Sequence, residues 1–153
     1  MMTAYEEAIV KFAEASGEKL DLPADRVATL MADGRVVQLK PSGETEDGMT
    51  AFTAVARTED GAEFSRETLA TALSLNLFGT ETLGANLGLF ADTIFLSKEI
   101  ALVGITSEAL AEELLAFARL AADIEKRIGV GLGEQEAVTH SAEEIGKSGF
   151  IQV

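Results

Sequence analysis

The sequence predicts an α+β domain in which helices pack on one side of a twisted antiparallel sheet, in the order α-β-β-β-α-β-β-α. Two well-marked helix starts, at Ser65 and Thr106, bracket a pair of short apolar strands. An amphipathic helix and three strand segments precede them. With 153 residues, of which 47% are hydrophobic, the chain can bury a sizeable core, and we expect one domain over residues 1–128.

The first helix is predicted to begin after Thr3, which forms a capping box with Glu6, and to end at Gly17. Helical spacing gives this segment one apolar face, formed by Tyr5, Ala8, Ile9 and Phe12. A face of this kind most often belongs to a core.

Three strands are predicted next. Residues 27–31 and 36–39 flank the dipeptide Asp33-Gly34, which favours the two positive φ angles of a type I′ hairpin turn. A polar, acidic loop over residues 41–48 then leads into a third strand at 49–55.

The second helix is predicted to start at Ser65 and to stop at Gly79, with Phe64 and Leu69 placed to close a hydrophobic staple. Steps of four residues put three leucines on one face of it, Leu69, Leu73 and Leu77.

A second hairpin is predicted from residues 85–90 and 94–96, and the last helix follows from Thr106 to Ile128. Its alternating steps of four and three residues form a long apolar stripe of Leu110, Leu114, Phe117, Ala121, Ile124 and Ile128. The pattern ends there, and we expect residues 129–153 to form a flexible acidic tail.

Composition excludes several classes of function. The chain has 12 basic and 26 acidic residues, a formal net charge of −14, which disfavours nucleic acid and anionic membrane surfaces as partners. It has no cysteine, so disulfides, thiolate catalysis and cysteine-rich zinc sites are excluded. No secretion signal or membrane-length apolar run is present, and we expect a cytoplasmic protein.

No pattern of catalytic or metal-binding residues stands out. The glycines of residues 129–133 lack the spacing of a nucleotide-binding loop, and His140 is the single histidine. The clustered carboxylates lack the alternation of a calcium loop, and no nucleophile accompanies a base. We therefore expect no enzyme activity, no cofactor and no metal, although an orphan metabolic enzyme is a weaker alternative.

The first hairpin carries apolar residues on both faces of the sheet. Leu30 is followed by Met31, and Val36 by Val37, and neighbouring residues of a strand point to opposite faces. Helices of the same chain cover only one of these faces, so we expect a second subunit or an extended partner to cover the other.

The second helix, the second hairpin and the approach to the last helix form one pattern. It consists of Leu73-Ser-Leu-Asn76-Leu-Phe78, a link through Gly84, Leu87-Gly-Leu89, Ile94-Phe-Leu96, and Ile100–Val103 before an acidic, leucine-rich helix. These segments together resemble the class I type III secretion chaperones, the CesT and SycE-like family. The resemblance extends over most of residues 1–128, and the predicted order of elements is also that of the family.

The resemblance implies an ATP-independent, homodimeric chaperone that binds the N-terminal region of a type III secreted effector. A regulatory adaptor of the same fold, bound to a transcriptional regulator or another chaperone, is the alternative. The first helix and first hairpin would form the client groove, for which we expect Tyr5, Ile9, Phe12, Leu30, Val37 and Phe52. The second helix and the strand after it would form the dimer contact, through Leu69, Leu73, Leu77, Leu87 and Leu89.

Overall fold

The computed structural model describes residues 2–17, 22, 24–59, 62–77, 82–129 and 151–152. The predicted helix stop at Gly79, the histidine His140 and most of the predicted tail lie outside the described residues. The elements are α1 (Ala4–Ser16), β1 (Ala28–Ala32), β2 (Arg35–Ser42), β3 (Gly48–Arg57), α2 (Arg66–Asn76), β4 (Asn86–Phe90), β5 (Thr93–Ala101), α3 (Ser107–Ile128) and β6 (Ile151–Gln152). This order confirms the predicted α+β fold and adds a short strand at the C-terminal end.

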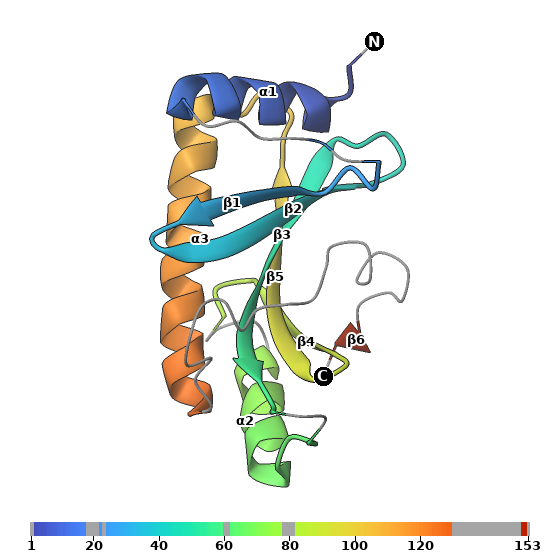
Figure 1. The fold of residues 1–153 in the computed structure, drawn as a ribbon. Helices are drawn as coiled ribbons and strands as arrows, with labels where there is room; N and C mark the ends of the chain where they lie inside the picture. The colour runs from blue at the N-terminus through green and yellow to red at the C-terminus, as the bar shows by residue number, and fades with distance from the viewer. Residues whose placement is uncertain are drawn as a thin grey trace.

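The strands form one antiparallel sheet in the order β1-β2-β3-β5-β4-β6. Helix α3 runs along the sheet, with α1 across one end of the molecule and α2 at the other (Figure 1). It contacts β3, β1 and both other helices, so its buried stripe fills the layer between helices and sheet. The β1 strand lies at one end of the sheet, and the β4 strand lies near the other.

The local signals for helix starts and for the first turn are confirmed. Thr3, Ser65 and Thr106 each accept a hydrogen bond from the backbone N–H three residues later, at 3.1 to 3.2 Å. Asp33 and Gly34 both have positive φ angles, 51° and 78°, as a type I′ turn requires.

Strand β2 is longer than predicted, because Pro41 belongs to it and not to the loop. Pro41 is paired with Met49 of β3, whereas β1 is paired with β2 only as far as Leu39. Pro41 therefore sits where β2 has a neighbour on one side, and its missing N–H removes no bond to β1.

The first hairpin has apolar residues on both sides of the sheet, as predicted. Leu30 and Val37 are paired and belong to the core under the helices. Met31 and Val36 form the next pair and therefore point to the opposite face, where Met31 is 54% exposed.

Candidate protein-binding surfaces

Five of the six residues predicted to contact a client are core residues of the single chain. Tyr5, Ile9, Leu30 and Val37 are buried together between the helices and the sheet, while Phe52 is buried on the other face. Only Phe12 is half-buried, at the rim of the main core. The client contact stays a prediction for all six, and the five buried side chains offer no free surface in this structure.

Tyr5 anchors α1 to the start of the sheet. Its side chain is fully buried, and its hydroxyl lies 2.8 Å from the carbonyl oxygen of Arg26 and 2.9 Å from that of Leu39. Burial raises the pKa of the Tyr5 hydroxyl to about 12, because the phenolate would lose its hydration. The phenol is therefore a neutral structural donor.

A cluster of ion pairs fixes the same end of α1. The Arg26 guanidinium contacts the carboxylates of Glu46 and Glu6, and the Glu46 carbonyl accepts the backbone N–H of Tyr5 at 3.2 Å. Hydrogen bonds from Arg26 lower the pKa of the Glu46 carboxyl below its ordinary value. The cluster holds α1, the approach to β1 and the β2–β3 loop in one arrangement.

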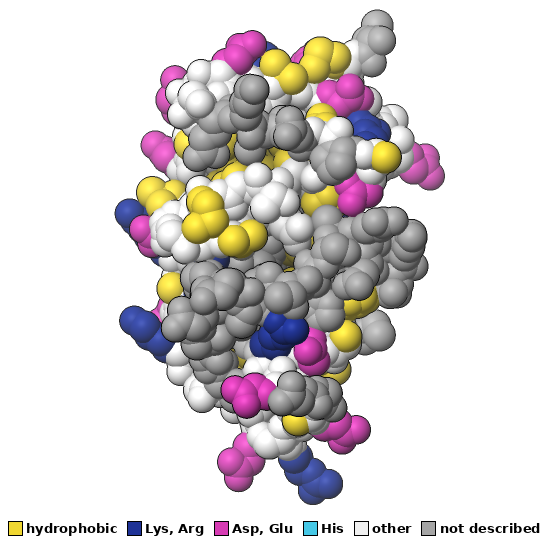
Figure 2. Space-filling view, in the orientation of Figure 1, with side chains coloured by type: hydrophobic (Ala, Val, Ile, Leu, Met, Phe, Trp, Pro, Cys, Tyr) yellow, Lys and Arg dark blue, Asp and Glu magenta, His cyan; other side chains and the backbone are white. Residues whose placement is uncertain are grey.

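The sheet face opposite the helices carries a second apolar cluster. The rings of Phe52 and Phe95 pack edge to face, with centroids 6.3 Å apart, among Val27, Ala54 and Phe90. In Figure 2, hydrophobic side chains also reach the surface at the level of the β1–β2 hairpin. Exposed Met31 and half-buried Val36 extend the cluster toward the β1 edge.

That edge of the sheet is open in the described part of the chain. Strand β1 is hydrogen-bonded to β2 on one side and has no described strand on the other. An unpaired edge presents backbone N–H and C=O groups that can pair with another strand. Met31 lies next to these groups, so apolar and backbone contacts are available side by side.

Of the five residues of the predicted dimer contact, two are exposed, two are half-buried and one is fully buried. Leu73 of α2 and Leu77, which follows the end of α2, are 53% and 60% exposed. The inward face of α2 is instead formed by Thr68, Ala72 and Leu75. Leu69 and Leu89 are half-buried, whereas Leu87 is fully buried beneath α2. The exposed leucine side of α2 and the outer part of β4 thus form one surface, here called the α2–β4 surface.

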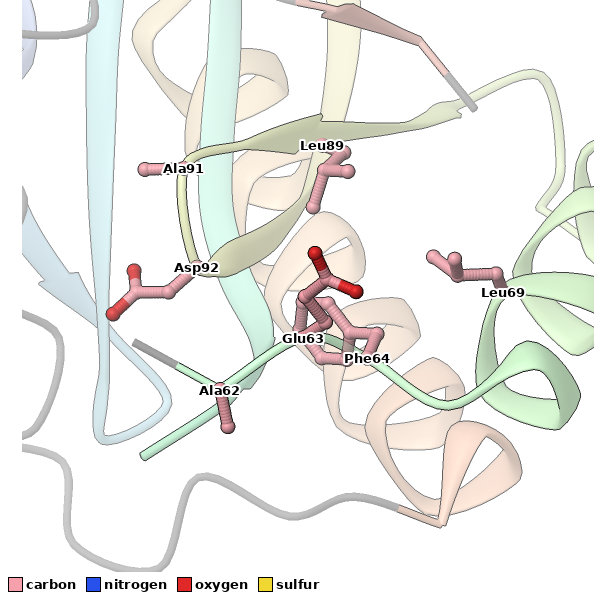
Figure 3. A pocket seen from close by; sticks show the side chains of 7 residues that line it. All are labelled: Ala62, Glu63, Phe64, Leu69, Leu89, Ala91 and Asp92. Atoms are coloured by element: carbon pink, nitrogen blue, oxygen red, sulfur yellow. The ribbon is translucent and has the colours of Figure 1, made fainter. Parts of the chain in front are cut away.

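A pocket of about 610 Å³ opens at this surface. Figure 3 shows Leu69 of α2 and Leu89 of β4 pointing toward it from two sides, with the Phe64 ring below both in this view. Two residues with carboxylates, Glu63 and Asp92, also line it. The full lining is Ala62, Glu63, Phe64, Leu69, Leu89, Ala91 and Asp92.

Asn76 is a residue whose role the sequence did not reveal. Its side-chain Nδ2 donates to the Leu87 carbonyl at 3.0 Å, and its Oδ1 accepts from the Leu87 N–H at 2.8 Å. A polar residue between Leu75 and Leu77, at the end of an amphipathic helix, is the sequence signal that marks it.

The described residues contain no group of three or more metal-binding side chains of the His, Cys, Asp and Glu types. Among the helices of that same part of the chain, none has the length and hydrophobicity needed to cross a membrane.

Solved structures with the same fold include secretion chaperones in complexes. Yersinia pestis SycH, described as a type III secretion chaperone bound to a fragment of YscM2, has a TM-score of 0.58 at 20% identity, covering 78% of this chain and 98% of that one. The ExsC–ExsE complex gives 0.63 at 17% identity, with 78% and 90% covered. The HopA1–SchA chaperone–effector complex gives 0.59 at 14% identity, with 80% and 94% covered.

At these identities, the likeness concerns the fold. A search among curated proteins found no significant match. The sequence profile of the Tir chaperone protein (CesT) family matches residues 8–140, which is most of the chain. The protein therefore belongs to the Tir chaperone protein (CesT) family.

Proposed function

We propose that the protein is a cytoplasmic, ATP-independent chaperone that binds the N-terminal segment of a type III secreted effector and keeps it soluble. In this role it acts as a homodimer and performs no catalysis. The observation that carries the proposal is the β1 edge, which no described strand of the chain covers, with exposed Met31 beside it. Family membership and the likeness to a chaperone–effector complex support the same role.

An extended client segment would add a strand to β1. Backbone hydrogen bonds give such pairing affinity that tolerates many sequences, and alternate side chains give it selectivity. On the face opposite the helices, those side chains would meet Met31 and Val36 and extend the cluster around Phe52. In this proposal the client contacts Met31 and Val36, which are sequence neighbours of the buried residues Leu30 and Val37.

The charge of the chain supports a soluble carrier. A formal net charge of −14 keeps complexes apart by repulsion and favours clients with basic segments. Association with a basic client should therefore slow as the salt concentration rises, because salt screens the attraction between the acidic chain and the client.

Calorimetric titration with the N-terminal segment of an effector encoded beside the chain's gene tests the proposal. Met31→Glu should weaken binding at least tenfold, because it places a charge where an apolar contact is proposed. Val103→Glu is the matched control, since Val103 is 78% exposed and lies in the turn between β5 and α3, outside the β1–β2 hairpin. Equal affinities of Met31→Glu and the unmodified chain, both folded by circular dichroism, would rule out this surface.

A further inference from the structure

The β4 strand has outward-facing backbone groups that its own chain satisfies in two places. The first is Leu87, whose N–H and C=O both bind the side chain of Asn76. These two groups of Leu87 therefore point away from β5, toward the outer edge of the sheet.

The second place is two residues further along. Because backbone directions repeat every second residue in a strand, the N–H and C=O of Leu89 face the same edge as those of Leu87. There the C-terminal strand β6 pairs antiparallel with β4, with Leu89 opposite Ile151 and Gly88 opposite Gln152. The Asn76 side chain and β6 thus cover the edge at Leu87 and at Leu89, the next residue whose backbone groups face outward.

This closed edge is part of the α2–β4 surface. Leu89 contributes its backbone to the pairing with β6 and its side chain to the pocket, where it meets Leu69. Exposed Leu73 and Leu77 continue the same surface along α2. A second copy that approached α2 and β4 would therefore meet β6 at the β4 edge.

We propose that β6 is a built-in competitor that occupies the β4 edge and weakens self-association through the α2–β4 surface. The inference rests on the homodimer in the proposed function. A segment of the same chain competes at an effective concentration that does not change with dilution, whereas a second copy competes at its own free concentration. Release of β6 would expose the backbone of Leu89 and allow tighter dimers.

The test compares full-length chains that differ only in β6. The double variant Ile151→Pro with Gln152→Pro removes both backbone N–H groups of β6, including that of Ile151, which faces Leu89 in the pairing. The double variant Ile151→Val with Gln152→Thr is the control, because it keeps both groups and favours a strand. Sedimentation equilibrium measures the dimer dissociation constant, and hydrogen exchange of the Leu89 amide, in samples dilute enough to be monomeric, measures the pairing.

The proline variant should dimerise at least fivefold more tightly than the control, and its Leu89 amide should exchange faster. Unchanged exchange would show that β6 does not cover the edge and would overturn the inference. Faster exchange with an unchanged dissociation constant would overturn it too, as would monomers in every variant. Effector titration on the same samples is a separate readout, because loss of effector binding in all of them contradicts the proposed function itself.

Discussion

Asn76, the last residue of α2, replaces a neighbouring strand for Leu87 by binding both its N–H and its C=O. A carboxamide carries the same donor and acceptor as a peptide group, so one side chain satisfies both. The contact fixes the end of α2 against β4. It thereby sets the position of the exposed leucines on α2 relative to the sheet.

Asn76→Ala should lower the free energy of unfolding by about 1 to 3 kcal/mol, since it leaves two partly buried backbone groups of Leu87 without their partner. Urea unfolding measures the change. Ser74→Ala, an exposed position on the same helix, is the control and should change stability by less than about 0.5 kcal/mol. Equal stability of the two variants would show that water replaces the carboxamide at no cost.

Glu125→Ala should destabilise the fold by about 1 to 3 kcal/mol, because it removes the carboxylate partner of a buried guanidinium. Arg35, the first residue of β2, is buried, and it donates to Glu125 of α3 at 2.7 Å and to the Ala54 carbonyl at 2.8 Å. The loss should appear in urea unfolding as a lower midpoint.

The same helix offers a matched control for this ion pair. Asp123 contacts Arg127 at 3.2 Å, and both side chains are largely exposed. Asp123→Ala should therefore cost less than about 1 kcal/mol. If both alanine variants lose the same small amount of unfolding free energy, the ion pair between Arg35 and Glu125 stabilises the fold no more than a surface pair does.

Glu46 should make stability depend on acid pH. Hydrogen bonds from Arg26 lower the pKa of its carboxyl from the ordinary 4.5, so the folded state holds this proton less tightly than the unfolded chain. The contribution is present in full above pH 4.5 and is lost as the pH falls through the lowered pKa. Urea unfolding from pH 6 downward should therefore show the advantage of the unmodified chain over Glu46→Gln shrinking toward acid.

Glu44→Gln, on the same loop, controls for the loss of a nearby carboxylate. The change in its free energy of unfolding between pH 6 and acid pH should be almost the same as in the unmodified chain. If the difference in unfolding free energy between the unmodified chain and Glu46→Gln stays constant down to the lowest pH, the ion pair with Arg26 is contradicted.

The elements of the fold are predictable because their signals are local. Thr3, Ser65 and Thr106 mark helix starts through a hydroxyl and the N–H three residues later, and Asp33-Gly34 specifies its turn alone. Apolar spacing then assigns helices and strands.

The surface is less predictable because core and groove residues share the same chemistry. Nothing near Tyr5 or Ile9 in the sequence says that α3 and the sheet will bury them on all sides. Arg35 and Glu125 likewise meet only in the folded chain, across 90 positions of sequence. Burial is a property of packing between distant elements, whereas spacing reports only which residues share a face.

Phe12→Ala distinguishes a groove residue from a core residue. Phe12 is half-buried at the rim of the core, so we expect Phe12→Ala to reduce both client affinity and stability, each moderately. Client affinity should fall by about 1 to 3 kcal/mol if the ring is an anchor. Stability should fall by less than the roughly 3 to 5 kcal/mol of a fully buried phenylalanine.

Both quantities are measured on one protein, by urea unfolding and by calorimetric titration with the effector segment. Ile9→Ala is the comparison, because Ile9 is buried and should lose stability with little change in affinity. A Phe12→Ala chain that loses stability alone would assign the ring to packing.

Leu73→Glu should separate the dimer without unfolding the chain. Leu73 is 53% exposed in the single chain, so a glutamate there keeps its hydration in the monomer. In a symmetric dimer formed through α2, each glutamate would lose water in an apolar contact, and the same surface of the other copy would bring a second one. Sedimentation equilibrium at micromolar concentration should show self-association weakened at least tenfold.

Leu75→Glu shows what core damage looks like on the same helix. Leu75 is one of the inward residues of α2, and a charge buried there without a partner should unfold the chain at ordinary temperatures. Thermal melts of the two variants therefore distinguish loss of contact from loss of fold. A Leu73→Glu chain that stays folded and self-associates as tightly as the unmodified protein would place the dimer contact away from α2.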